Sequence, residues 1–374
     1  MPMVQSEEIY HKLAERLDAI PNGFSPTPSG AEVRLLAKLF TPDEAALAAV
    51  MKLVPETAEE IAARADVDPK AAYAMLKEMA RKGLIFAGRH DRKLGFWLMP
   101  VAVGIYEMQL PRMDAELAAL FEAYYQESQG GTMVRHNPPL NRVIPVGEAV
   151  RFDMEVYSHE SAAAILDEAR SWGVQDCLCR TQQRLVGKGC DHTVHNCITF
   201  STAEHAFDHS TVTQAISKEE ALCILREAEK EGLVHTTGNY RTGHFFICNC
   251  CTCCCGILRG VAEFAIPTAI AHSDFLVQVD QELCTGCELC TERCPFHALT
   301  VDRVCAVDEN RCLGCGICVS VCPAEALQLV RRPLASPPPA DMDEWMEQRA
   351  QDRGISLDDL RQERTRQAAH TDDP

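Results

Sequence analysis

The sequence predicts an α+β fold that is divided among several domains. Apolar residues recur at helical spacing within the first 100 residues and again near residues 158–173 and 218–232. Short segments of alternating apolar residues, typical of strands, follow residue 270. All 20 cysteines of the 374-residue chain lie between Cys177 and Cys322. This distribution separates a cysteine-rich centre from cysteine-free ends.

Residues 1–105 are predicted to form helices followed by a hairpin. Segments 57–66 and 69–83 each have one apolar face, with Asp68 as an N-cap and Pro69 at the first helical position. Strand-like segments at 84–86 and 96–98 are joined by a polar, basic tip. Helix, turn, helix and a two-stranded wing resemble the winged helix-turn-helix of bacterial regulators.

The charge of this module argues against a role in DNA binding. A DNA-binding module would present Lys70, Tyr73, Lys77 and Arg81 from its second helix and Arg89, Arg92 and Lys93 from its wing. However, residues 31–100 hold 11 Lys and Arg against 10 Asp and Glu, and the whole chain has a net charge of −18. DNA-binding domains usually carry a basic footprint. We therefore expect no nucleic-acid partner, and we expect a partner protein with a basic docking face.

Residues 106–270 are predicted to form a mixed α+β domain that contains most of the irregularly spaced cysteines. Helices are expected near 113–127, from Ser158 to Gly173, and from Ser217 to Gly232, with a strand near 142–149. The chain begins without the apolar core of a signal peptide, and no stretch of about 18 apolar residues could span a membrane. A cytoplasmic location is therefore expected, where thiols stay reduced and dense cysteine indicates metal binding.

Two cysteine runs form an internal repeat after residue 271. The first has the pattern CxxCxxCxxxCP and contains Cys284, Cys287, Cys290 and Cys294; the second recurs 28 residues later and contains Cys312, Cys315, Cys318 and Cys322. These runs resemble those of the bacterial two-cluster ferredoxin, in which the fourth cysteine of each run binds the other cluster. A zinc ribbon is disfavoured because each run has a third cysteine and ends in Cys-Pro.

The ferredoxin resemblance implies a domain at residues 271–332 with two [4Fe-4S] clusters. Cys284, Cys287, Cys290 and Cys322 would hold the first cluster, and Cys312, Cys315, Cys318 and Cys294 the second. Alternating apolar residues around the runs would exclude water from the clusters. Cys305 lies outside both runs and is predicted to be a buried thiol.

The middle domain contains a second set of cysteines. Cys177, Cys179, Cys190 and Cys197 are the first candidates for a third iron–sulfur cluster, and Cys248, Cys250, Cys251, Cys253 and Cys254 are additional candidate ligands. Adjacent side chains such as those of Cys250 and Cys251 diverge, so they would serve two metals or leave one thiol free. Zinc and a redox-active thiol pair or sulfur carrier are the alternatives. The CxCR and CNCCxCC motifs, followed by the ferredoxin runs, are similar to those of 4Fe-4S binding proteins of anaerobes.

Polar residues near these cysteines could bind an anion or deliver protons, but they are more simply interpreted as solvated loop residues. No residue is assigned as catalytic. The set comprises Arg180, Arg184, Lys188, His192, His195, His205, Tyr240, Arg241 and His244. Residues 333–374 form a Pro-rich acidic tail, interpreted as a tether or as a docking segment anchored by Trp345.

The sequence therefore favours an iron–sulfur electron-transfer protein over other functions. It would relay single electrons through two [4Fe-4S] clusters to or from a further cysteine-bound metal site or a redox partner. An electron carrier is favoured over a reductase component. A redox-sensing transcription regulator and a sulfur-transfer or cluster-assembly factor are the alternatives.

Overall fold

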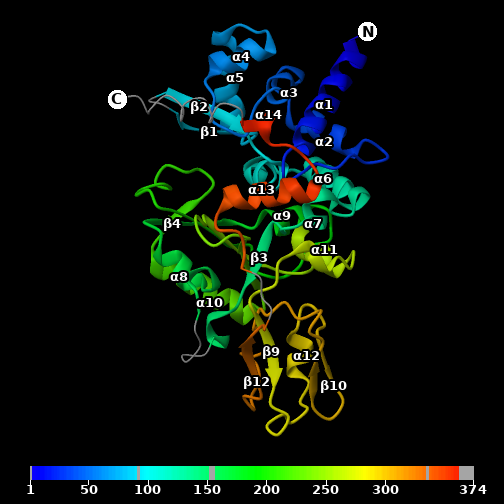
Figure 1. Cartoon of the computed structure of the whole chain (residues 1–374), viewed down its shortest axis with the longest axis vertical. Coiled ribbons are helices and arrows are strands. Elements are labelled where there is room, and N and C mark those ends of the chain that lie inside the picture. The colour runs from blue at the N-terminus through cyan, green and yellow to red at the C-terminus, as the bar shows by residue number, and fades with distance from the viewer. Residues whose placement is uncertain (1, 91–92, 151–155, 334–336, 362–374) are drawn as a thin grey trace. The chain divides into compact units, whose positions relative to one another are not determined.

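The computed structural model describes residues 2–90, 93–150, 156–333 and 337–361, and Figure 1 labels its elements. The chain forms two compact units, Met1–Met133 with Met346–Pro374, and Val134–Trp345. Helices and sheets contribute to the chain, which confirms the predicted α+β class. The predicted wing residue Arg92 lies outside the described residues.

The first unit begins with helices and a hairpin, and its fourth and fifth helices lie at the predicted positions, whereas the hairpin strands are longer than predicted. Its elements in this part are α1 (Pro2–Asp18), α2 (Ala31–Leu39), α3 (Pro42–Ala48), α4 (Ala58–Ala65), α5 (Pro69–Arg81), β1 (Ile85–His90) and β2 (Lys93–Leu98). Thr57 begins α4 with a capping box, and the Asp68 side chain accepts a hydrogen bond from the Ala71 backbone N–H to begin α5. The antiparallel pairing of β1 with β2 completes the predicted order of helix, turn, helix and hairpin.

The sequence predicted domains at 1–105, 106–270, 271–332 and 333–374, whereas the structure groups the chain into two units. Helix α6 (Ala115–Ser128) belongs to the first unit because Leu117 and Phe121 are part of its buried core. Of the tail, residues 346–353 of α13 (Met342–Arg353) and α14 (Asp358–Arg361) belong to this unit, and Leu360 lies in the same core. The fully buried Arg349 donates hydrogen bonds to the Pro21 and Thr132 carbonyls. Burial of these side chains holds the described part of the tail within the folded unit.

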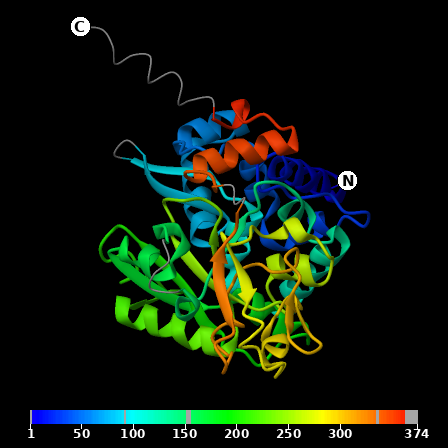
Figure 2. The same ribbon diagram turned by 60° about the horizontal axis from the view of Figure 1, so that its bottom comes forward.

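The second unit contains a six-stranded antiparallel sheet. In spatial order its strands are β3 (Asn141–Ile144), β7 (Val234–Gly238), β8 (Phe246–Cys250), β5 (His195–Ser201), β4 (Ser171–Asp176) and β6 (Gln214–Ile216). Helix α10 (Lys218–Glu231) packs on β4, β5 and β7 and is seen below the strands in Figure 2. Its predicted ends are confirmed, with Ser217 as the N-cap and Gly232 as a left-handed C-cap.

One predicted helix of this unit was too long. The sequence predicted a helix from Ser158 to Gly173, but α8 (Ala162–Asp167) is short and β4 begins at Ser171. Trp172 pairs with Phe200 on one side and Ile216 on the other. Tertiary strand pairing therefore overrides the local helical pattern here. The other helices that lead into and through this region are α7 (Gly131–Arg135), α9 (Leu178–Leu185) and α11 (Gly256–Ala262).

The ferredoxin segment forms two small antiparallel ribbons around α12 (Leu289–Arg293) (Figure 1). Strand β9 (Phe275–Val279) pairs with β12 (Leu327–Arg331), and β10 (Leu299–Val301) pairs with β11 (Cys305–Val307). The predicted alternation of buried residues is observed in β9 and β12. Because β9 precedes the first cysteine run and β12 follows the second, their pairing brings the two runs together.

Candidate metal centres

Cysteines from both ferredoxin runs surround one cavity. Cys284, Cys287 and Cys290 come from the segment between β9 and α12 and from α12 itself, and Cys322 comes from the segment before β12. All four line the cavity, and Cys305 of β11 lines it as a fifth thiol. The cavity therefore gathers the four residues that the ferredoxin resemblance implies for the first cluster.

The walls of this cavity are closely fitted to the cysteine sulfurs. Gly286 has a φ of +69°, and a Cβ at this position would lie 2.6 Å from the Arg303 carbonyl oxygen, so only glycine fits. The Cys305 backbone N–H donates to Cys284 Sγ at 3.3 Å, and Cys305 Sγ lies 3.7 Å from Cys290 Sγ. Cys305 is buried, as predicted, but the sequence did not indicate that it faces ligand sulfurs. Such donors stabilise a negatively charged sulfur and tune a cluster's potential.

The cysteines expected to hold the second cluster are also close together. Cys312, Cys315 and Cys318 are buried. Burial, together with smaller effects of the neighbouring Cys294 and Cys312, raises the pKa of the Cys315 thiol to about 12. Burial likewise raises the pKa of Cys318, with contributions from Cys315 and Cys294. A proton would therefore be held on these thiols unless a metal replaced it.

The two ferredoxin groups differ in their access to solvent. Cys287 of the first group is exposed. The second group faces the six-stranded sheet domain, where the Val146 N–H donates to the Cys315 carbonyl at 2.9 Å. A Cβ on Gly316 would lie 2.5 Å from the Ala149 side chain, which shows how closely the two segments approach. The first group therefore lies near the surface and the second lies toward the interior of the unit.

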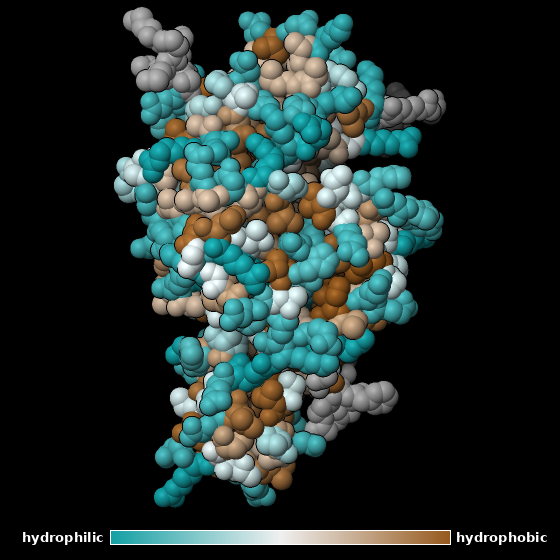
Figure 3. All heavy atoms as spheres, turned by 180° about the vertical axis from the view of Figure 1, so that it is seen from behind, coloured by the Kyte–Doolittle hydropathy of each residue, from teal (hydrophilic) through white to brown (hydrophobic). Residues whose placement is uncertain are grey.

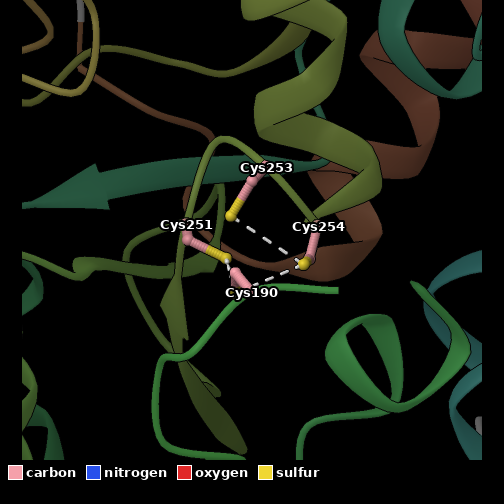
Figure 4. A group of neighbouring side chains, drawn as sticks. All are labelled: Cys190, Cys251, Cys253 and Cys254. Atoms are coloured by element: carbon pink, nitrogen blue, oxygen red, sulfur yellow. Dashed lines mark hydrogen bonds between the residues drawn. The ribbon is translucent and has the colours of Figure 1, made fainter. Parts of the chain in front are cut away.

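A third group, which we name the loop quartet, consists of Cys190, Cys251, Cys253 and Cys254. Their sulfur atoms all lie within 4.8 Å of one another. Cys190 Sγ is 3.5 Å from Cys254 Sγ and 3.9 Å from Cys251 Sγ. Figure 4 shows that three of the cysteines come from the loop before α11 and that Cys190 reaches them from a separate segment. The quartet has the number and type of ligands required for a tetrahedral zinc or a cubane cluster.

Six further cysteines form a fourth group, which we name the thiol ring: Cys177, Cys179, Cys197, Cys248, Cys250 and Cys255. Side-chain hydrogen bonds join Cys177 to Cys179 and Cys179 to Cys255. Others join Cys255 to Cys250, Cys250 to Cys248, and Cys248 to Cys197. The charge of Cys197 also raises the pKa of Cys177, which relates the two ends of this series to one another.

The structure thus distributes the predicted middle-domain ligands over two groups. Cys190 joins the loop quartet, whereas Cys177, Cys179 and Cys197 join the thiol ring. Cys255 belongs to the ring but was not among the predicted ligands. The signal that could have identified it is the second adjacent pair in the sequence, Cys254-Cys255, because neighbouring side chains diverge.

Arg180 is a fully buried cation between these two groups. Its guanidinium donates to the Thr193 and Asn249 carbonyls at 2.9 and 2.5 Å and to Asn196 Oδ1 at 2.9 Å. Burial lowers the pKa of Arg180, but negative charge on nearby thiols more than offsets this and raises it. The charged neighbours that raise its pKa are thiols, and its Nε lacks a hydrogen-bond partner among the described residues. A buried charge requires compensation, which thiolates of both groups are placed to provide.

The thiols of Cys177, Cys250 and Cys251 are the ones that interact most strongly with Arg180. Cys177 and Cys250 belong to the ring, and Cys251 belongs to the quartet. Hydrogen bonds from Cys248 and Cys255 lower the pKa of Cys250 to about 6 despite its burial. Hydrogen bonds from Cys253 and Cys254 lower the pKa of Cys251 as well. Each group therefore contains one thiol that its neighbours favour in the thiolate form.

A different cluster of possible ligands consists of His159, Glu160 and Asp274, and its two carboxyl groups contact arginines. Arg331 donates to both oxygens of Glu160, at 2.8 and 2.9 Å, and Arg142 lies 3.1 Å from Asp274 Oδ1. Arg331 therefore neutralises the Glu160 carboxylate, and Arg142 is within ion-pair distance of Asp274. A cation at this position would compete with them, so we assign the cluster a structural role in joining β9 and β12 to the sheet domain.

Comparison with sequence families supports the ferredoxin part of the chain. The family described as a 4Fe-4S binding domain matches residues 277–300 and 306–328, one match for each cysteine run. Comparison with the curated proteins and with the solved structures found no significant match. Within the described residues, no helix is both long and apolar enough to cross a membrane. The chain carries a 4Fe-4S binding domain with two repeats, and the protein is therefore an iron–sulfur protein.

Proposed function

We propose that this protein transfers single electrons, with two [4Fe-4S] clusters held in residues 271–332 and a third held by the loop quartet. The observation that supports this most strongly is that one compact unit, Val134–Trp345, holds both the cavity lined by four ferredoxin cysteines and the loop quartet. A bound [4Fe-4S] cluster supplies one-electron chemistry at a potential set by burial and hydrogen bonding. The reduced thiols that such ligation needs fit a cytoplasmic protein.

The ligand sets that we propose follow the grouping of the thiols. Cys284, Cys287, Cys290 and Cys322 would hold the first cluster, because these four line one cavity. For the second cluster we propose Cys312, Cys315, Cys318 and Cys294, whose thiols are close neighbours. Both sets consist only of soft thiolates, which suits iron–sulfur chemistry.

The exposed edge of the first cysteine group is suited to docking a redox partner. Leu283 and Leu289, with 51% and 45% of their surfaces exposed, flank the exposed Cys287. Glu282 and Glu288 are exposed in the same loop. Apolar surface on the ferredoxin segment is also visible at the lower end of Figure 3. An apolar centre with acidic neighbours favours a partner with a basic docking face.

The loop quartet would hold the third cluster. Its four sulfurs converge from two segments, and three of its residues, Cys190, Cys251 and Cys254, are at least partly buried. The second ferredoxin group, rather than the exposed first one, contacts the domain that carries the quartet through Val146 and Cys315. This order of exposure is expected of a protein that receives electrons at its surface and delivers them to an interior site.

Metal analysis of the full chain, purified without oxygen, tests the proposal. Two cubanes require about 8 irons per chain and three require about 12, with matching sulfide. We expect the wild type to exceed 8 irons, and Cys190→Ala to lose about 4 of them while keeping the ferredoxin EPR signals. The control is Cys223→Ala, which removes an exposed thiol on α10.

Two results would contradict the third cluster. One is a wild-type protein with 8 irons and one zinc, because the quartet would then be a zinc site. The other is a Cys190→Ala variant with the same iron content as Cys223→Ala. Free, alkylatable thiols at Cys251, Cys253 and Cys254 would instead favour the sulfur-transfer alternative.

We propose that the N-terminal helices and hairpin form a winged-helix module that contacts protein rather than DNA. Lys70, Tyr73, Lys77 and Arg81 are exposed on α5, as a recognition helix would require. However, Arg81 is paired with Glu78 at 2.6 Å, and the Lys77 ammonium lies over the Tyr73 ring at 5.7 Å. These intramolecular contacts reduce the positive charge that α5 offers to phosphates.

A further inference from the structure

The thiol ring lies outside the metal sites of the proposed function, and its composition is unusual for a protein interior. Cys250 and Cys255 are buried, and Cys177, Cys179, Cys197 and Cys248 are half-buried. Each of these thiols has another thiol of the ring as a neighbour. The S–H group is only a weak donor, so thiols that are paired mainly with other thiols satisfy one another poorly. All six are free cysteines.

The backbone directs these thiols away from the loop quartet. Cys248 and Cys250 are two residues apart on β8, so their side chains lie on the same face of the strand. Cys251 follows directly and lies beside Cys190 of the quartet. Cys255 is the N-cap residue of α11 and contacts Cys250, whereas Cys254 lies 3.5 Å from Cys190. Two consecutive pairs are thus each divided between two separate sites.

The buried charge of Arg180, which the ring shares with Cys251 of the loop quartet, is a second observation that points to a ligand. Its guanidinium is fully buried, its Nε lacks a partner among the described residues, and Cys177 and Cys250 are its strongest ring neighbours. Neutral thiols would leave this cation uncompensated in the interior. Metal-bound thiolates carry negative charge and would stabilise it.

We propose that the thiol ring holds a second thiolate-bound metal centre in the middle domain, distinct from that of the loop quartet. A tetrahedral zinc or a single cubane requires four cysteine ligands, so six thiols fit a polynuclear centre. Iron–sulfur and polynuclear zinc centres share this thiolate ligation, and metal analysis distinguishes them. The inference does not depend on the quartet holding a cluster, because the two groups have no residue in common.

Single and double variants of the full chain test whether the two sites are separate. Cys250→Ser and Cys197→Ala damage the ring, Cys190→Ala damages the quartet, and Cys223→Ala is the matched control. All variants are purified without oxygen, and iron, zinc and sulfide are measured per chain. Because the ferredoxin cysteines are in the same unit, retained ferredoxin EPR signals report that a variant has folded.

We expect each ring variant to lose iron or zinc that Cys190→Ala retains. The Cys190→Ala/Cys250→Ser double variant should lose the sum of the two single losses. If Cys190→Ala keeps all its metal while the ring variants lose some, the metal centre in the thiol ring is supported and the proposed cluster in the loop quartet is contradicted. The inference is overturned if both ring variants match Cys223→Ala in metal content. It is also overturned if both single variants lose metal and the double variant loses no more than each of them alone, because the ten thiols would then form one centre.

Discussion

Cys250 and Cys251 are consecutive in the chain, yet their thiols belong to different groups. Cys250 is hydrogen-bonded to Cys248 and Cys255, whereas Cys251 Sγ lies 3.9 Å from Cys190 Sγ. The sequence predicted that adjacent cysteines would diverge toward two metals or leave one thiol free. The observed geometry separates them in the manner that two metals would require. The peptide between the two residues would then be a short covalent connection between neighbouring centres.

The first prediction concerns the ferredoxin ligands. Cys287→Ala should lose one cluster and Cys315→Ala the other, because a methyl group cannot replace a thiolate ligand. Each variant should lose about 4 irons and retain the other ferredoxin EPR signal. Iron analysis and EPR of anaerobic samples provide the measurement. Full iron content with an unchanged spectrum in either variant would show that the assigned residue is not a ligand.

The second prediction concerns Cys305, which lines the cavity of the first cysteine group. Its thiol is 3.7 Å from Cys290 Sγ and could donate to that sulfur once Cys290 binds metal as a thiolate. Cys305→Ala removes this donor and should make one cluster harder to reduce. A hydrogen bond of about 1 kcal/mol corresponds to a decrease of roughly 40 mV for one electron.

Redox titration followed by EPR measures this shift, and Cys305→Ser is the matched variant because its hydroxyl can still donate. The expected order of potentials is Cys305→Ala below both Cys305→Ser and the wild type, with unchanged iron content. A loss of about 4 irons in Cys305→Ala would instead identify Cys305 as a ligand.

The local elements of this chain were largely predictable because their signals are local. Asp68-Pro69 and Ser217 fixed the starts of two helices through capping, and Gly232 fixed the end of one. The exception is the segment at Trp172, which has a helical pattern but pairs as a strand with Phe200. That pairing partner lies 28 residues away, so no local rule could indicate it.

The candidate sites were less predictable than the helices and strands, because their residues meet through contacts between segments that are distant in the sequence. The regular spacing of the ferredoxin runs predicted all eight of their cysteines as ligands, and four of these line one cavity. In the middle domain, however, Cys190 finds its partners more than 60 residues later, at Cys251 and Cys254. Sequence proximity suggested Cys177, Cys179 and Cys197 as its partners instead. The burial of Arg180 depends on packing between distant segments and was also not predicted.

The third prediction concerns nucleic acid. We expect no sequence-specific duplex binding at physiological salt, because residues 31–100 are nearly neutral and the chain carries a net charge of −18. Fluorescence anisotropy with random and promoter-derived duplexes over a salt titration measures this. A sequence-dependent affinity that Lys70→Ala or Lys77→Ala weakens would contradict the prediction and favour the redox-sensing regulator.

The fourth prediction concerns the pH dependence of stability. Burial and a hydrogen bond with Glu160 raise the pKa of Asp274 to about 6 from 3.8. The folded state therefore favours protonated Asp274. This preference contributes to the free energy of unfolding in full below pH 3.8, and the contribution is lost as the pH rises through 6. Between pH 5 and 7 this should reduce the free energy of unfolding by roughly 1 kcal/mol.

Asp274→Asn mimics the protonated side chain and should remove this decrease. Thermal unfolding followed by circular dichroism at pH 5, 6 and 7 measures the slope, with the exposed Asp302→Asn as the control. Parallel pH profiles for the wild type and Asp274→Asn would show that Asp274 does not titrate in this range.

The last prediction concerns Arg180, the buried cation between the loop quartet and the thiol ring. Arg180→Met keeps much of the side-chain volume but removes the charge and the hydrogen bonds to Thr193, Asn196 and Asn249. Negatively charged thiolate centres would then lose their compensating charge, so both middle-domain sites should bind metal less tightly. Arg180→Lys keeps the charge without the planar fork and should retain more metal than Arg180→Met.

Metal content per chain after incubation with a chelator measures the order of metal retention, which we expect to be wild type, then Arg180→Lys, then Arg180→Met. The ferredoxin EPR signals should remain in all three proteins. Equal metal retention in all three would mean that the buried guanidinium serves only to hold the Asn249 and Thr193 backbone, and that the charge of the thiol groups is balanced by other means.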